Sequence, residues 1–118
     1  MKTNLSALIC FVMSSSAFAT VPKILVCTTG YAKLAMSSES RELYVGSMET
    51  KDEDVVSREN EHGRASMYFD AQLNQFNGSG EDGCVQVEYI TQTDAQGNTV
   101  LLENADGVET TFPCQWLK

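Results

Sequence analysis

Cysteine is the residue type whose spacing in this sequence constrains the chemistry most. After an apolar N-terminal stretch that contains Cys10, the chain has three more cysteines, at Cys27, Cys84 and Cys114. None of them forms a C-x-x-C pair, and there is only one histidine, so the pattern does not match a zinc site. We expect the protein to be in an oxidising compartment, where these three cysteines would form one disulfide and leave one free thiol.

The single histidine, His62, is the side chain best suited to act as a general base near neutral pH. It lies in a charged segment, and the sequence ties no nucleophile to it, although Cys84 could supply one. Carboxylate pairs are abundant, but glycoside cleavage also requires a groove that a chain this short rarely builds. We therefore expect no catalysis, and a small hydrolase that uses His62 is the least favoured function.

Four acidic residues are predicted to gather at one end of the C-terminal hairpins: Glu81, Asp82, Glu103 and Asp106. Carboxylate oxygens are ligands that Ca²⁺ prefers. The sequence nevertheless lacks the ligand spacing of an EF-hand loop, and aspartate and glycine are common in turns for conformational reasons alone. We predict no metal site and no cofactor, with calcium bound by these four residues as the alternative.

The net charge excludes one large class of partners. The chain has 16 acidic and 8 basic residues, a formal net charge of −8. Nucleic-acid affinity comes largely from lysine and arginine that neutralise phosphates, so we expect no nucleic-acid binding. Cationic proteins, peptides or metals would be attracted to such a surface, while the same acidity also serves solubility alone.

Residues 1–19 have the features of a signal peptide. Lys2 precedes an apolar run from Leu5 to Met13, and Ala17-Phe18-Ala19 matches a small-x-small cleavage site. A membrane span requires about 20 residues, and this apolar run is shorter, so we expect no membrane insertion. Cleavage would leave residues 20–118 as a single domain in the periplasm or outside the cell, and the loss of Lys2 would change the net charge from −8 to −9.

Alternation of apolar and polar residues dominates the rest of the chain, and it predicts antiparallel strands with one buried face. The clearest strand spans 64–73. Three further strands, separated by glycine-containing turns, form a C-terminal three-stranded meander over residues 85–91, 99–103 and 108–117.

The N-terminal half is predicted to contribute strands at 23–29, 31–36 and 41–49. Residues 50–63 are rich in charge and have only Val55 and Val56 as apolar anchors, which suits either a short helix or a loop. We favour a solvated connection over a recognition loop for this segment. No long amphipathic helix is visible, so the expected fold is all-β, a small antiparallel sandwich or barrel of six to seven short strands.

The meander decides which cysteines can pair. Cys84 should lie near the level of Val108, whereas Cys114 lies six residues further along the last strand, about 20 Å away. A disulfide tolerates only about 7 Å between α-carbons, so we expect Cys27 to pair with Cys114, which requires the first and last strands to be neighbours. Cys84 is then the free thiol, and we expect it to be buried rather than to form an intermolecular bridge.

Two tyrosines are candidates for an interface, because aromatic side chains commonly anchor one. Tyr68 stands on the polar face of the clearest strand beside Arg64 and Asp70, and Tyr44 faces away from its apolar neighbours. These four residues are the predicted partner-binding group, with packing of both tyrosines under a covering sheet or loop as the alternative. The leading hypothesis is a small exported acidic domain that binds a protein or peptide, a basic one being one option, as an inhibitor, adhesin or accessory subunit.

One cysteine in the first strand and one in the last is a layout similar to that of exported lysozyme-inhibitor barrels. The similarity implies a basic protein target, which suits an acidic chain, although no inhibitor motif matches it residue by residue. The competing hypothesis is a structural component of the cell envelope that assembles through an edge strand or through Cys84. The sequence does not predict the oligomeric state.

Overall fold

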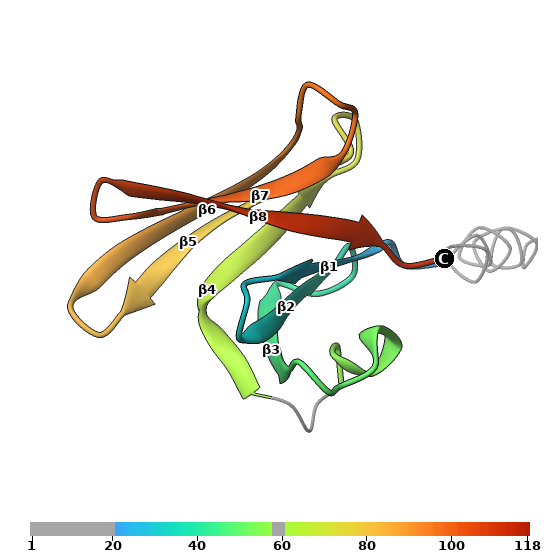
Figure 1. The fold of residues 1–118 in the computed structure, drawn as a ribbon, viewed down its shortest axis with the longest axis horizontal. Coiled ribbons are helices and arrows are strands. Elements are labelled where there is room, and N and C mark those ends of the chain that lie inside the picture. Colours follow the sequence, from blue (N-terminus) through green and yellow to red (C-terminus); the bar gives the residue numbers. More distant parts are fainter. Residues whose placement is uncertain (1–20, 58–60) are drawn as a thin grey trace, which may run out of the picture.

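The computed structural model describes residues 21–57 and 61–118, without the side chains of Glu61, His62 and Arg64. In that part the chain forms eight antiparallel strands that close into a barrel, each paired with the next in sequence and the last with the first (Figure 1). The predicted all-β class is confirmed, and the architecture is a barrel rather than a sandwich. The proposed signal peptide lies outside the described residues, and no described helix is long and apolar enough to cross a membrane.

The elements follow one another around the barrel in chain order. The segment between β3 and β4 contains a short 3-10 helix, η2 (Asp52–Asp54). The strands are β1 (Ile24–Thr28), β2 (Ala32–Ser37), β3 (Glu42–Ser47), β4 (Glu61–Asp70), β5 (Gln75–Asp82), β6 (Val85–Thr93), β7 (Thr99–Ala105) and β8 (Val108–Trp116).

The barrel has eight strands, so the expected count of six to seven is wrong. The strand that was missed is β5, because its sequence Asn77-Gly78-Ser79-Gly80 resembles a turn. Pairing places Gly78 between Met67 and Tyr89 of the neighbouring strands. A Cβ added to Gly78 would collide with the carbonyl oxygen of Ser66 and lie 2.5 Å from Met67 Sδ. The glycine therefore reflects close packing inside the barrel rather than a chain reversal.

The strand predicted at 64–73 is shifted toward the N-terminus. It is β4, Glu61–Asp70, and a turn follows in which Asn74 has a φ of 53°. The ladder between β3 and β4 changes register between Glu42 and Tyr44, where β4 contains extra residues, and Figure 1 shows β4 bending along its length. A bulge of this kind bends the strand that carries it, which helps a sheet to curve into a barrel.

The C-terminal meander is confirmed by β6, β7 and β8, which pair in sequence over nearly their full lengths. Its two turns contain glycines with positive φ, Gly97 at 87° and Gly107 at 90°. Both turns reverse the chain sharply, as hairpin connections between twisted strands require.

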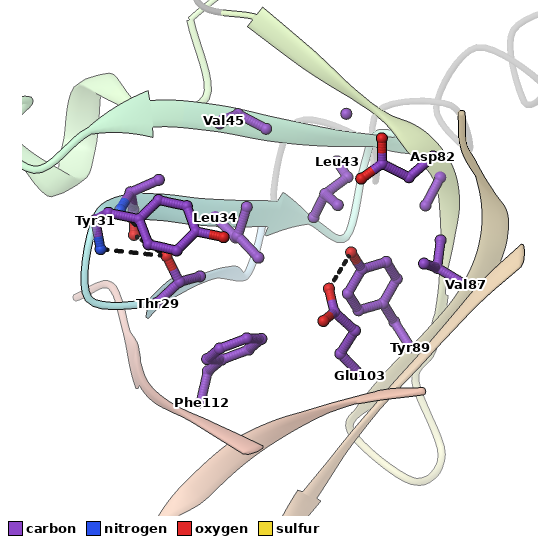
Figure 2. Close-up of a pocket in the computed structure, with 13 residues that line it drawn as sticks. Thr29, Tyr31, Leu34, Leu43, Val45, Asp82, Val87, Tyr89, Glu103 and Phe112 are labelled. Carbon is purple, nitrogen blue, oxygen red and sulfur yellow. Dashed lines mark hydrogen bonds between the residues drawn. The ribbon is translucent and has the colours of Figure 1, made fainter. Parts of the chain in front are cut away.

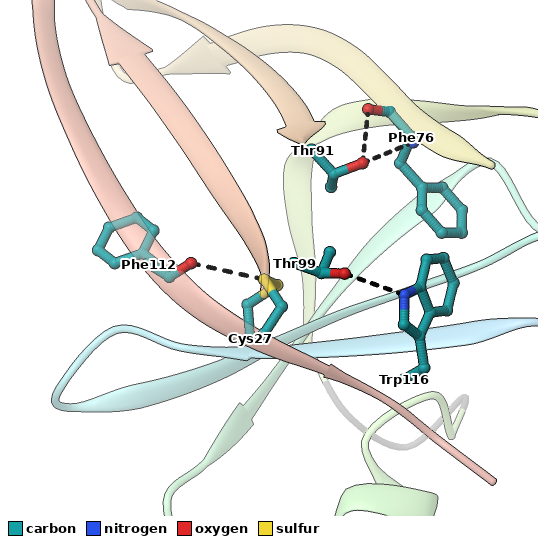
Figure 3. Close-up of a disulfide and its surroundings, with 7 residues drawn as sticks. Cys27, Phe76, Thr91, Thr99, Phe112 and Trp116 are labelled. Carbon is teal, nitrogen blue, oxygen red and sulfur yellow. Dashed lines mark hydrogen bonds between the residues drawn. A yellow bond between two sulfur atoms is a disulfide. The ribbon is translucent and has the colours of Figure 1, made fainter. Parts of the chain in front are cut away.

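The first and last strands are neighbours, and the predicted disulfide between Cys27 and Cys114 joins them (Figure 3). The two cysteines are direct partners in the β1–β8 ladder. That ladder contains only three residue pairs, from Leu25 with Trp116 to Cys27 with Cys114. A covalent bond therefore reinforces one of the shortest seams of the barrel.

The expected burial of Cys84 is wrong. Cys84 is a free, exposed thiol in the β5–β6 turn, next to Gly83, whose φ is 68°. The turn projects beyond the shorter strands of the N-terminal half (Figure 1), so nothing in the described part packs over it. Turns of this kind lie at the surface because their backbone groups require solvent.

Large side chains fill one end of the barrel. The Phe76 ring lies 4.8 Å from that of Phe69 and 6.0 Å from that of Trp116, measured between centroids. Trp116 Nε1 donates a hydrogen bond to Thr99 Oγ1 at 3.1 Å, and the Phe76 N–H donates one to the buried Thr91 Oγ1 at 2.9 Å (Figure 3). The fully buried residues around them include Leu25, Met36, Met67 and Leu101. This end is sealed by the hydrophobic core.

A second apolar cluster lies on the outer wall. Val55 is fully buried against Val26 of β1 and Ala35 of β2. Lys33 Nζ donates to the Thr50 carbonyl oxygen at 2.6 Å and forms an ion pair with Asp52 at 2.7 Å. Residues 50–57 are thus docked on the barrel, which corrects the expectation of a solvated connection, and residues 58–60 lie outside the described part.

Replacing both half-cystines, as Cys27→Ala with Cys114→Ala, should lower the free energy of unfolding by about 2–4 kcal/mol, because the disulfide restricts a long loop of the unfolded chain. Denaturant unfolding followed by Trp116 fluorescence measures the change. Cys84→Ala is the control and should change stability by less than about 0.5 kcal/mol, since that side chain is exposed. Equal losses in the two proteins would contradict the role given to the disulfide.

Gly78→Ala should destabilise the barrel by about 1–3 kcal/mol, because the new methyl group meets the β4 backbone and must displace it. Ser79→Ala, at the exposed neighbouring position, serves as the control. Thermal and denaturant unfolding measure both. If Gly78→Ala were as stable as Ser79→Ala, the close approach of β4 and β5 would be wrong.

Candidate functional site

The other end of the barrel is open and holds a pocket of about 290 Å³ (Figure 2). Binding pockets for small molecules usually have volumes of about 300–1,000 Å³, so this one suits a single side chain or a small ligand. We call it the mouth pocket. Its lining residues come from seven strands and the β1–β2 turn, and they are Thr29, Tyr31, Ala32, Leu34, Leu43, Val45, Gly63, Ala65, Asp82, Val87, Tyr89, Glu103 and Phe112.

Small residues at inward-facing positions create the pocket. Gly63 and Ala65 of β4 line it, and Gly80 of β5 lies between the lining residues Ala65 and Val87 in the ladders. Further along the same two strands, Met67 and Phe76 are fully buried. An eight-stranded barrel is just wide enough to be filled by side chains, so omitting them at one end leaves room for a ligand.

Glu103 places a carboxylate inside the mouth. It is the direct β7 partner of Tyr89 in β6, and the Tyr89 hydroxyl donates a hydrogen bond to Glu103 Oε2 at 2.8 Å (Figure 2). Burial raises the pKa of Tyr89 above its ordinary value, and the Glu103 carboxylate raises it further as hydrogen-bond acceptor and as negative charge. Tyr89 therefore stays protonated at neutral pH and holds Glu103 in place.

The mouth pocket is both acidic and aromatic. Asp82, at the end of β5, adds a second carboxylate to the lining, while Tyr31 is 83% exposed at the rim. Figure 2 shows Tyr31 and Phe112 on one side of the pocket and Tyr89 with Glu103 on the other. The described lining contains no lysine or arginine. The described residues of the pocket thus combine the negative charge of Glu103 with aromatic ring faces.

The four acids considered as calcium ligands do not form one site. Asp82 and Glu103 line the mouth pocket, but Glu81 precedes Asp82 in the strand and so faces the other side of the sheet. Asp106 is exposed in the β7–β8 turn. No group of three or more His, Cys, Asp or Glu side chains in the described part of the chain is placed to hold a metal ion. The geometry therefore gives calcium no support.

Two of the four residues predicted to bind a partner have contacts within the fold. Tyr44 is half-buried in the outer cluster against Val55, and its hydroxyl lies 3.1 Å from Ser40 Oγ. Asp70 Oδ1 accepts the N–H groups of the two turn residues Gln72 and Leu73. The alternative of a covered tyrosine thus holds for Tyr44, because residues 50–57 fold over that face.

Tyr68 is 47% exposed on the outer wall, where the Arg41 guanidinium lies 5.3 Å from its ring centroid. The side chains of Arg64 and His62 lie outside the described residues, so the structure places neither of them.

The sequence analysis considered Glu103 only as a calcium ligand and did not identify Tyr89, Tyr31 or Phe112 as site residues. A signal for the site was present in β7. Leu101 is inward and fully buried, so Glu103, two residues later, shares the core-facing side of the strand. An acid at a core position is rare without a partner and marks a position that merits attention.

Tyr89→Phe should change the stability of the protein at alkaline pH. The raised pKa of Tyr89 means that the unfolded chain releases the phenolic proton first, above its ordinary pKa of about 10. The contribution of Tyr89 to the free energy of unfolding is therefore complete below that pH and declines as the pH rises further. Denaturant unfolding at a series of pH values should show a smaller alkaline decline in Tyr89→Phe than in Tyr68→Phe, and identical declines would contradict the environment described here.

No match was found when the chain was compared with models of protein families, with curated proteins and with solved structures. Function is therefore inferred from the mouth pocket itself.

Proposed function

We propose that this protein is a small exported binding domain whose mouth pocket receives a cationic group of a protein or peptide partner. The observation that carries the proposal is Glu103, an inward-facing carboxylate held by Tyr89 in an open pocket whose described lining residues include no lysine or arginine. An acid in such a position costs solvation free energy unless a positive charge accompanies it. A basic side chain from outside supplies that charge.

The pocket offers a cation two kinds of attraction. Glu103 provides negative charge in partly buried surroundings, where Coulomb attraction is stronger than in water. Tyr31, Tyr89 and Phe112 provide ring faces, and a cation over such a face gains about 0.5–2 kcal/mol. The net charge of −8 also steers basic molecules toward the protein.

Export is supported by the leader-like N-terminus and by the disulfide, since such bonds persist in oxidising compartments. A binding role is preferred to catalysis because the described pocket holds carboxylates and a protonated tyrosine but no nucleophile paired with a base.

Assembly through Cys84 is a second candidate function, and the exposure of that thiol at a hairpin turn favours it. Disulfide-linked dimers that are absent from Cys84→Ser would support assembly. The two functions are compatible, because Cys84 does not line the mouth pocket.

The binding function is tested with N-acetyl-lysine methylamide, a probe that carries one ammonium group. It should perturb the NMR signals of Tyr89 and Glu103, and Glu103→Gln should weaken its binding about 3- to 10-fold by removing the charge while keeping the side-chain shape. Glu109→Gln removes an equal charge from an exposed position of β8 outside the mouth pocket and is the matched control.

A loss of affinity in Glu103→Gln alone supports the mouth as the binding site. Equal weakening in both variants would show that only the overall charge matters, and the absence of any shift at high probe concentration would refute the proposal.

A further inference from the structure

The first half of β8 is an open edge of the barrel. Val108 to Pro113 pair with β7, whereas β8 pairs with β1 only from Cys114 to Trp116. In the described part of the chain, the residues before Cys114 therefore have a strand neighbour on one side. Val108, Glu109, Thr110 and Thr111 are all exposed.

Unequal strand lengths produce this edge. β1 has five residues and ends at Thr28, whereas β8 has nine. Figure 1 shows the β7–β8 hairpin extending well past the end of β1. The barrel wall thus has a step at the mouth, where β8 continues and its neighbour does not.

The edge has the chemistry of a strand that can accept another. An edge strand presents unpaired N–H and C=O groups from alternate residues, and proteins usually protect such edges with lysine, proline or burial. The sequence Val108-Glu109-Thr110-Thr111-Phe112 contains neither lysine nor proline, and valine, threonine and phenylalanine favour extended backbone. Proline appears only at Pro113, where pairing with β1 is about to begin.

The mouth pocket lies directly beside this edge. Phe112 of β8 lines the pocket, and Glu103 belongs to the adjacent strand β7. Alternate side chains of a strand added next to β8 would face the barrel interior, as alternate side chains of β8 do. One of them would reach the acidic and aromatic lining.

We propose that the open edge of β8 binds an extended segment of a basic partner by strand addition, with one lysine or arginine side chain entering the mouth pocket. The backbone ladder supplies affinity and the pocket selects the side chain, as in other complexes formed by strand addition. This inference rests on the proposed function and specifies how the partner engages.

Charge decides between a foreign segment and a second copy of the chain. Each copy carries a net charge of −8, and the pocket beside the edge already contains Glu103 and Asp82. Pairing two such edges would bring like charges together in the mouths, which is unfavourable. A basic segment instead brings a positive charge to the Glu103 carboxylate.

The test uses the full chain after removal of residues 1–19, as Cys84→Ser, and the probe peptide acetyl-Val-Thr-Lys-Thr-Val-amide. The peptide should shift the backbone amide signals of residues 108–112 together with the signals of Tyr89 and Glu103. Two further peptides carry an N-methyl group, one on lysine and one on the following threonine. Because neighbouring residues of a strand direct their N–H groups to opposite sides, one of them should bind about fivefold or more weakly, and the other about as well as the parent.

A peptide with glutamate in place of lysine should bind at least about fivefold more weakly than the parent peptide, because it places a third carboxylate in the pocket. If both N-methylated peptides bind as well as the parent, or if the shifts avoid β8, strand addition is wrong. Concentration-dependent dimers that protect the β8 amides from exchange without peptide would overturn the choice of occupant.

The outcomes for this proposal and for the proposed function are separable. If N-acetyl-lysine methylamide binds through Glu103 while the peptide leaves β8 unchanged, the cation site stands and strand addition is refuted. If the peptide binds the edge equally well with lysine or glutamate, strand addition stands and the cation site is refuted.

Discussion

Closure of the barrel between β1 and β8 is the constraint on which the rest of the structure depends. A sheet that does not close has two edges and a solvated inner face, whereas the short β1–β8 ladder turns that face into a core. The disulfide between Cys27 and Cys114 fixes the register of this seam. The register in turn determines where β8 leaves β1 and where Phe112 stands relative to the mouth.

The size of the inward-facing side chains then divides the barrel into two parts. Phe76, Met67 and Trp116 fill one end, and Gly63 and Ala65 leave the other hollow. Glu103 lies in the hollow part, where Tyr89 hydrogen-bonds it without neutralising it. The hydrophobic core and the mouth pocket thus lie at opposite ends of one closed sheet, an arrangement in which a rigid scaffold would support the proposed site.

Much of the fold could be predicted from period-two alternation and turn residues. The meander of β6 to β8 and the pairing of Cys27 with Cys114 followed from local patterns and chain geometry. The strand β5 could not be predicted in this way. Its Gly78 packs closely against Met67, a residue that only the folded structure brings near. The continuous apolar run of β1 likewise reflects burial on both faces, since Val55 covers its outer side. The mouth pocket was missed because a hollow arises from the combined sizes of residues on many strands.

The hydrophobic core at the opposite end of the barrel determines how a molecule could enter and leave the mouth pocket. Because the rings of Phe76 and Trp116 pack against each other at the far end of the barrel, the mouth pocket opens at one end only. A molecule bound in the mouth pocket would leave through the same opening by which it entered. The water that it displaces would leave through that opening too. Tyr31, exposed at that opening, therefore lies on the path of both entry and exit.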